Sequence, residues 1–399
     1  MTDTEQQFLH IVRAFARDEQ INLPQDTDLT NLLQPAKIHS LSAVVGYALN
    51  HQLQAKAFAD TETSRKLQRI LFQTVIKQTQ RLQAFEDLLD RLNAAEIPVV
   101  LFKGCVVNRY YPDHAVRTFG DIDFLIQKTD QDRGDALMLE WGYTRSIAEG
   151  TVWMYTKGNE KYEVHTALMP NLSVLTSSVQ AFITSVWENT VPTKRKCVFE
   201  LEPNYHFLFL LLHLAKHMRS TGAGVRMYLD LALMRKHELA LSEMHLTAEA
   251  DKLGFGEFFR SAMALCHHWF GTVVSLPDQP IKPEVLEALE KYVMAAGVFG
   301  FHGRNPAVAR LRDQQGGINR FGAIVRYIFP SYASMKDTYA FVNGRPILLP
   351  VVWVVRWWDG LFRRRKRAAN IFKGMFTERD AAKASELLLQ SIGLTGRMK

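Results

Sequence analysis

The chain of 399 residues is poor in cysteine, because its three cysteines, Cys105, Cys197 and Cys266, stand far apart. An odd number of cysteines without metal-ligand spacing predicts neither a disulfide framework nor a zinc site. The N-terminus is polar and acidic, whereas an export signal is basic and then apolar. We therefore expect a protein of the reducing cytoplasm.

The chain also lacks an uninterrupted hydrophobic run of the length that spans a bilayer, which is about 20 apolar residues. The apolar run from Ile347 to Phe362 is shorter and is interrupted by Pro350, Arg356 and Asp359. We therefore predict that the chain has no transmembrane helix.

Basic charge is not spread evenly along the chain, although the net charge is +7. The window from Arg345 to Lys373 contains eight basic residues and one acidic residue, so its excess equals that of the whole chain. A local excess argues against a nucleic-acid-coating surface over the whole protein. Nucleic acid is accordingly a disfavoured partner.

The apolar patterns divide the chain into four regions. Residues 1–95 have apolar residues at three- and four-residue spacing with little glycine, which is typical of helices. Residues 96–200 combine short β-branched runs with helix-like stretches, which predicts a small α+β domain with a mixed sheet. Residues 201–320 are again helical in pattern, and residues 321–399 contain an aromatic and basic amphipathic segment.

Two carboxylates, Asp121 and Asp123, open the apolar run DIDFLI. Residues i and i+2 of a strand project from the same face, so we expect the two side chains to converge. Converging carboxylates repel one another unless hard cations such as Mg²⁺ or Mn²⁺ hold them. Glu163, in the run YEV, supplies a third metal ligand from a neighbouring strand, as two-metal sites usually require.

Lys103 and Gly104 stand upstream, where the run PVVLF is followed by a helix-like stretch. A glycine at a strand-to-helix junction lets a phosphate approach backbone N–H groups at the start of a helix. Lys103 adds a positive charge at the same place. We therefore predict that Lys103 and Gly104 bind the phosphates of a nucleotide.

The stretch LFKGCVVNRYYPDHAVRTFGDIDFLI resembles the signature of the uncharacterised nucleotidyltransferase family of the polymerase-beta-like superfamily. The superfamily pattern of a glycine turn, a helix, an acidic-apolar-acidic strand and a later carboxylate falls on Gly104, Asp121, Asp123 and Glu163. The resemblance implies a polymerase-beta-like core flanked by helical regions, with these carboxylates as catalytic residues. It also implies that Arg117 holds a phosphate or the acceptor, and ordering of the loop is the alternative for this arginine.

Three histidines have both a chemical and a structural interpretation. His165 follows Glu163 by two positions and would share its strand face, so it acts as a base or, as we favour, as a structural histidine. His213 and His217 are four residues apart on one helical face. This spacing is compatible with zinc, but no third ligand is evident, and a packed or phosphate-facing helix is favoured.

Arg226 is a further candidate for nucleotide binding, because it could reach phosphates across a cleft between the α+β and helical regions. It also stands four residues before Asp230, on the same face of the predicted helix. An ion pair between these two residues is the alternative that the spacing favours.

Three tryptophans, Trp353, Trp357 and Trp358, precede the basic run of residues 363–367. A helix in an anionic membrane interface uses aromatic anchors together with attraction to headgroups. One interpretation is therefore peripheral contact with the inner membrane face through residues 347–367. The other is a helix that packs its aromatic face on the core and leaves the basic run in water.

These observations favour a metal-dependent enzyme that transfers a nucleoside monophosphate from an NTP such as ATP to a hydroxyl or phosphate acceptor, releasing pyrophosphate. The acceptor would be a small molecule, a peptide or a protein. Two alternatives stay open. A glycosyltransferase would use the D-x-D motif to hold a nucleotide-sugar diphosphate through one metal ion, and a catalytically silent relative would bind a nucleotide or a partner protein.

Overall fold

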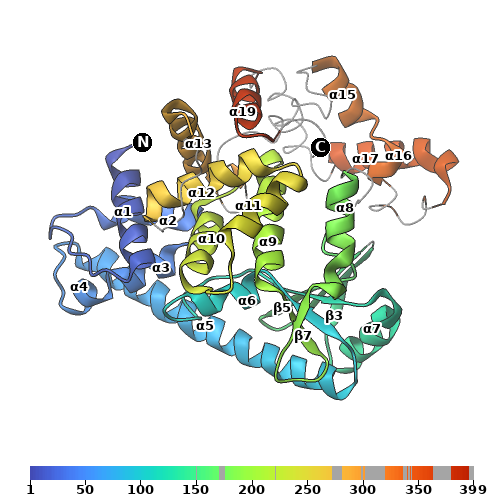
Figure 1. The fold of residues 1–399 in the computed structure, drawn as a ribbon, viewed down its shortest axis with the longest axis horizontal. Coiled ribbons are helices and arrows are strands. Elements are labelled where there is room, and N and C mark those ends of the chain that lie inside the picture. The colour runs from blue at the N-terminus through green and yellow to red at the C-terminus, as the bar shows by residue number, and fades with distance from the viewer. Residues whose placement is uncertain are drawn as a thin grey trace.

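The computed structural model of the chain has three layers in its main body (Figure 1). The long helix α5 (Thr61–Ala94) lies below a seven-stranded sheet, and a group of helices lies above it. The structure describes residues 1–149, 151–169, 176–220, 222–271, 281–297, 300–301, 320–335, 339, 342, 344–362 and 379–394.

The sheet is mixed and has the strand order β3-β4-β5-β2-β1-β7-β6. Strand β2 runs parallel to β5, and β1 runs parallel to β7, whereas the other neighbours are antiparallel. The strands are β1 (Val99–Leu101), β2 (Ile122–Ile126), β3 (Thr144–Glu149), β4 (Val152–Lys157), β5 (Glu160–His165), β6 (Thr190–Pro192) and β7 (Val198–Leu201). This mixed sheet between mainly helical regions confirms the fold class predicted from the sequence.

Alternation along β2 gives the sheet two different faces. Ile122 and Phe124 pack in the core between the sheet and the second half of α5, whereas Leu125 belongs to the core under the upper helices. Asp123 shares the upper face with Leu125 and is paired in register with Glu163 of β5. The pleat therefore places carboxylates on the face that the upper helices cover.

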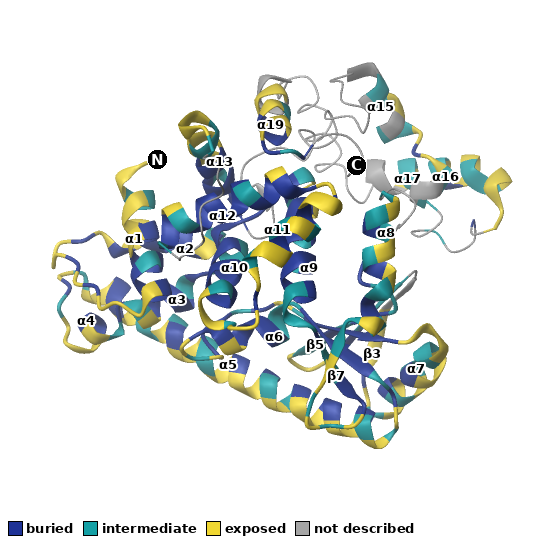
Figure 2. Cartoon of the chain, in the orientation of Figure 1, coloured by how far each residue is buried: buried dark blue, intermediate teal, exposed yellow. Residues whose placement is uncertain are grey.

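Helix α5 is 34 residues long and contributes to two cores. Asp60 caps its first turn by accepting a hydrogen bond from the N–H of Thr63 at 2.9 Å. Leu67 and Leu71 pack against the N-terminal helices, and Phe85 packs under the sheet. The opposite face of α5 is exposed (Figure 2). The N-terminal helices are α1 (Asp3–Arg17), α2 (Leu29–Ile38), α3 (Ser42–Ala48) and α4 (Asn50–Gln54).

The upper helices and the N-terminal helices enclose one continuous apolar core (Figure 2). Helix α9 begins at Pro203, which suits a first helical position because its missing N–H would have no partner there. The helices after the first strand are α6 (Gly104–Val107), α7 (Gln131–Glu140), α8 (Ser177–Thr184), α9 (Pro203–Arg219), α10 (Val225–His237), α11 (Glu243–Lys252), α12 (Gly256–Phe270) and α13 (Pro283–Ala295).

The C-terminal helices α15 (Arg320–Ile328), α16 (Tyr332–Met335) and α17 (Leu349–Phe362) lie together at one edge of the molecule (Figure 1), and α19 (Arg379–Ser391) follows. Trp353 and Trp357 of α17 donate their indole N–H groups to the carbonyls of Pro330 and Ile328, at 2.9 and 2.7 Å. Two of the three tryptophans are therefore held against the end of α15.

Within the ranges that the structure describes, no helix is long and apolar enough to cross a membrane. This agrees with the interruptions of the apolar run at residues 347–362. The basic run of residues 363–367 lies outside the described residues.

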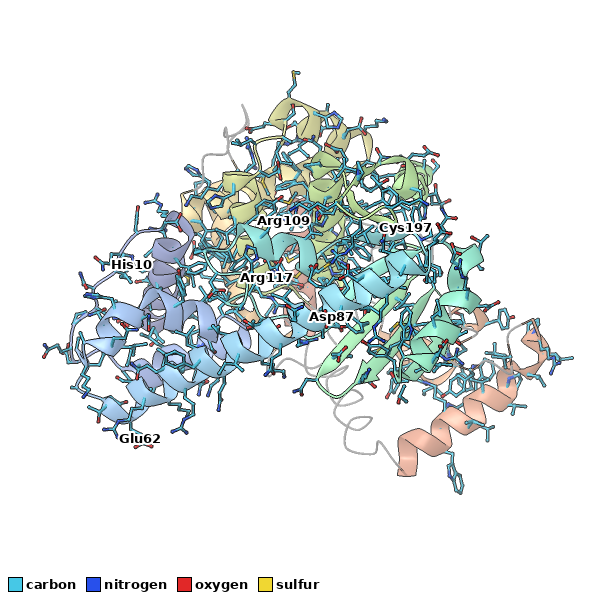
Figure 3. The ribbon with its side chains drawn as sticks, turned by 90° about the horizontal axis from the view of Figure 1, so that it is seen from below. His10, Glu62, Asp87, Arg109, Arg117 and Cys197 are labelled. Carbon is cyan, nitrogen blue, oxygen red and sulfur yellow. The ribbon has the colours of Figure 1, made fainter. Side chains whose placement is uncertain are left out.

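A buried ion pair joins the loop before β2 to the upper helices. Arg117 donates to both carboxylate oxygens of Asp230 on α10, at 2.8 Å from Nε and 2.7 Å from Nη2. Tyr111 donates a further hydrogen bond of 2.8 Å to the same carboxylate. The Arg117 side chain is 7% exposed and lies in the crowded centre of the molecule (Figure 3). Because water cannot screen either charge, each depends on the other.

Replacing Arg117 with alanine should lower the free energy of unfolding by about 3–5 kcal/mol, because Asp230 would stay buried without its partner. Arg195→Ala is the matched control, since Arg195 pairs with the exposed Glu86 and Asp90 and its loss should cost less than about 1 kcal/mol. Urea unfolding followed by circular dichroism measures both values. Equal losses for the two variants would contradict the importance of the buried pair.

Gly104 packs against Arg117, and a methyl group on Gly104 would lie 2.5 Å from Nη1 of the arginine. Since Asp230 fixes this guanidinium, Gly104→Ala should lower the free energy of unfolding by about 1–3 kcal/mol. The control is Gly120→Ala, because a methyl group there meets nothing within 4 Å and should change stability by less than about 0.5 kcal/mol. Thermal unfolding compares the two variants, and a Gly104→Ala protein as stable as the wild type would show that the guanidinium is not fixed.

Candidate active site

Acidic residues meet on the upper face of the sheet. His165 lies close to Asp123 and Glu163, with its Nε2 2.9 Å from Asp123 Oδ1 and 3.8 Å from Glu163 Oε2. One ligand atom of each of these three residues lies within 4.8 Å of the other two. Two carboxylates and an imidazole therefore converge on one point, which is a suitable set of ligands for a divalent cation.

Asp121 stands at the edge of this cluster. It precedes β2, which begins at Ile122, so the alternation expected of two strand residues does not fully apply to it. Its carboxylate is 34% exposed and lies 3.2 Å from Nζ of Lys161. Asp121 is nevertheless close enough to Glu163 to act on its pKa. Asp121 and Asp123 therefore converge less closely than the sequence predicts, because Asp123 is buried and Asp121 lies nearer the solvent.

Lys103 supplies positive charge to the cluster, because its Nζ donates to Asp123 Oδ1 at 2.7 Å. Burial opposes ionisation of Asp123, but Lys103 and His165 outweigh it and hold the pKa of this carboxyl well below its usual value. Burial and then the carboxylates of Asp121 and Asp123 raise the pKa of Glu163 to about 7. The neighbouring carboxylates therefore surround Glu163 with negative charge, and a divalent cation would neutralise it.

His165 is a buried histidine that positions Asp123. An ionised carboxylate can only accept hydrogen bonds, so Nε2 of His165 donates to Asp123 and Nδ1 is unprotonated. Nδ1 has no hydrogen-bond partner in the described part of the chain. Burial lowers the pKa of His165, which keeps the ring neutral. The geometry thus gives His165, together with Lys103, a role in orienting Asp123.

The backbone at Lys103 adopts a conformation that is rare for a residue with a side chain, with φ 58° and ψ −132°. His206 of α9 stabilises it, because its Nε2 accepts a hydrogen bond from the N–H of Lys103 at 2.9 Å. Burial and then the charges of Arg109 and Arg117 lower the pKa of His206 to about 3, so the ring stays neutral and able to accept. Lys103 is thus fixed at both its backbone and its side chain.

Two arginines hold the loop that leads into β2. Arg81 of α5 binds two successive backbone carbonyls, and Arg226 of α10 binds the carbonyl just before them. The hydrogen bonds join Arg81 Nη1 to Phe119 (2.6 Å), Arg81 Nη2 to Gly120 (2.8 Å) and Arg226 Nη1 to Thr118 (2.7 Å). Helices from two layers therefore fix the backbone immediately before Asp121.

The ion pair favoured for Arg226 and Asp230 from their helical spacing is not the one that forms. Asp230 accepts both of its guanidinium hydrogen bonds from Arg117, which comes from a distant part of the chain. The same bonds give Arg117 the loop-ordering role. Both arginines therefore contribute to the framework of the site, and their contact with nucleotide phosphates stays a prediction.

Helix α9 brings basic residues towards the acidic cluster. Phe209 packs against Phe102 with ring centroids 5.6 Å apart, and His213 lies one turn further along α9. Burial and then the charge of Lys103 lower the pKa of His213. Burial and then the charge of Lys103 lower the pKa of Lys216, three residues later, whereas Glu163 and Asp123 act to raise it. The last turns of α9 therefore place positive charge near the carboxylates.

His213 and His217 contact each other, with 3.1 Å between their Nε2 atoms. Within the described ranges, the group of three or more potential metal ligands is Asp123, Glu163 and His165, and it includes neither of these histidines. The contact between the two rings fits a packed helix, and a phosphate-facing role for it stays a prediction.

The seven predicted site residues thus fall into two groups. Asp121, Asp123 and Glu163 form the acidic cluster, and Lys103 is bound to it. Gly104, Arg117 and Arg226 instead pack around the loop before β2. Sequence reasoning missed several residues of the site. The spacing in the sequence could have identified Lys161 and Lys216. Lys161 is two residues before Glu163 in a strand, and Lys216 is three residues after His213 in a helix. Arg81 and His206 had no such signal, because only the tertiary fold brings them to the loop and to Lys103.

Comparison with known proteins identifies a family. A family model described as uncharacterised nucleotidyltransferase matches residues 25–271. No curated protein matches the chain. Among solved structures, the solution structure of the antibiotic-resistance factor ANT(2'')-Ia is similar at 11% identity and a TM-score of 0.34, covering 48% of this chain and 97% of that one. A structural similarity this low transfers no property to the chain. Because the family match extends over more than half of the 399 residues, the chain belongs to the uncharacterised nucleotidyltransferase family and is a transferase enzyme.

Proposed function

We propose that this nucleotidyltransferase uses Mg²⁺ or Mn²⁺ to transfer a nucleoside monophosphate from an NTP to a hydroxyl or phosphate group of a small molecule, a peptide or a protein, releasing pyrophosphate. The observation that carries the proposal is the pairing of Asp123 with Glu163 on one face of the sheet, with Asp121 close to them at its edge. Family membership supports nucleotidyl transfer in general. The dependence on a metal rests on the cluster itself.

The residues present fit a divalent cation. Asp123 and Glu163 would hold it, and His165, whose ligand atom lies within 4.8 Å of theirs, would join them as the tautomer with an unprotonated Nε2. Asp121, on the solvent side, would face the incoming nucleotide. A bound cation would neutralise the carboxylates and the negative charge that develops on the phosphates during transfer.

Residues of the chain itself would orient the substrates. Lys103 donates to Asp123, so a cation bound at this carboxylate would free the ammonium group for a phosphate of the donor. Lys161, beside Asp121, offers a second ammonium group at the solvent side. The arginines that fix the loop before Asp121 would keep the carboxylates in place while phosphates bind and leave.

Isothermal titration calorimetry with each NTP, with and without Mg²⁺ or Mn²⁺, tests this function. We expect NTP binding that requires the cation and is lost in the Asp121→Ala/Asp123→Ala variant. The control is Asp87→Ala/Asp132→Ala, which removes two exposed aspartates away from the cluster and should bind as the wild type does. Binding of nucleotide sugars alone would favour glycosyl transfer, and binding of no nucleotide would favour a silent relative.

The position of Lys216 predicts that α9 contributes to holding the triphosphate. Lys216→Ala should weaken NTP binding roughly tenfold, because a charge-assisted hydrogen bond to phosphate would be lost, and should change nucleoside binding little. Lys252→Ala, which removes a lysine whose side chain is 70% exposed and which pairs with Glu249, is the control. Calorimetry in the presence of Mg²⁺ measures both, and equal NTP affinities for Lys216→Ala and wild type would contradict the role of α9.

A further inference from the structure

The outer face of α17 and of the turn before it is apolar and exposed. The exposed fraction is 88% for Ile347, 50% for Val351, 59% for Val354, 44% for Val355 and 66% for Trp358. The spacing of these residues, at i, i+4, i+7, i+8 and i+11, forms a single stripe along a helix. Isolated apolar side chains are common on protein surfaces, but a continuous apolar stripe indicates an interaction site for a protein, a membrane or a ligand.

Contacts on the inner face of α17 hold the helix in place. Val352 is fully buried. The rings of Trp353 and Trp357 both pack against Phe329, at centroid distances of 5.1 and 5.3 Å. Arg356 donates to the carbonyl of Tyr327 at 2.5 Å. Within the described residues these contacts come from the inner face, whereas Ile347, Val351, Val354 and Val355 on the opposite face stay exposed.

The sequence that follows α17 indicates which partner the stripe fits. Residues 363–367 are five consecutive basic residues, in the window that contains the whole positive excess of the chain. A partner that is itself basic, a second copy of this chain included, is disfavoured by such a local excess of positive charge. An anionic surface would be attracted, and apolar side chains beside basic residues match the boundary between lipid acyl chains and headgroups.

We propose that the outer stripe of α17 binds the surface of a bilayer that contains anionic lipids. The helix lies along the surface, because it is too short and too interrupted to cross it. Val351 and Val354 enter the region just below the headgroups. This proposal is independent of the reaction that the enzyme catalyses, since none of these residues belongs to the acidic cluster.

Flotation of the full-length protein with vesicles tests the proposal. The vesicles contain either phosphatidylcholine alone or phosphatidylcholine with an equal part of phosphatidylglycerol. The test variant is Val351→Asp/Val354→Asp, which places two charges on the stripe. The matched control is Phe72→Asp/Ile76→Asp, which makes the same change on α5, where both residues are 57% exposed. Thermal unfolding confirms that each variant is folded, and sedimentation velocity gives its oligomeric state without vesicles.

We expect the wild type and the α5 control to float with the phosphatidylglycerol vesicles, and the α17 variant to bind at least tenfold more weakly. Binding to phosphatidylcholine alone should be much weaker, because the basic residues then have no anionic partner. Equal flotation of the α17 variant and the wild type would overturn the proposal. So would equal binding to both kinds of vesicle, absence of binding, or a dimer that the α17 variant dissociates.

Discussion

The structure of this enzyme depends on keeping a buried carboxylate ionised. Asp123 lies on the covered face of the sheet, where burial alone would favour its neutral form. Lys103 and His165 both donate to its Oδ1 and reverse that effect. For Glu163, its neighbour in register, burial and then the carboxylates of Asp121 and Asp123 raise the pKa instead. The pKa values of these two neighbouring carboxyl groups shift in opposite directions, which indicates that the site can accommodate one more positive charge.

The surrounding architecture serves to hold this arrangement rigid. The pair of Arg117 and Asp230 fixes the loop before β2 to α10, and Arg81 fixes the same loop to α5. His206 keeps Lys103 in its unfavourable backbone conformation. These contacts join α9 and α10 above the sheet, and α5 below it, to the residues of the site. Charged groups in the interior therefore have a consistent role, which is to position a few polar atoms at the expense of some stability.

Local rules account for the parts of the site that could be predicted from the sequence. The period of two along strands predicted that Asp121 and Asp123 share a face, which holds only loosely. Glu163 was expected from a neighbouring strand and does lie opposite Asp123 in register. The turn at Lys103 and Gly104 was recognisable from its neighbours. The same reasoning failed for Asp230, because helical spacing points to Arg226 whereas the partner, Arg117, is 113 residues earlier in the chain. Asp121 behaved differently from Asp123 because the strand begins one residue later. Long-range ion pairs and the ends of strands depend on how distant parts of the chain pack together. A short sequence motif carries no information about that packing.

Binding of Mn²⁺ alone, followed by electron paramagnetic resonance, tests the central claim most directly, because it needs neither the donor nor the acceptor. The wild-type protein should bind the ion, and Asp123→Asn, which keeps the size of the side chain and removes its charge, should bind it at least tenfold more weakly. Asp87→Asn, a change at an exposed aspartate of α5, should bind as the wild type does. A wild-type protein that binds no Mn²⁺, or an Asp123→Asn variant with unchanged affinity, would contradict the account of the acidic cluster as a metal site.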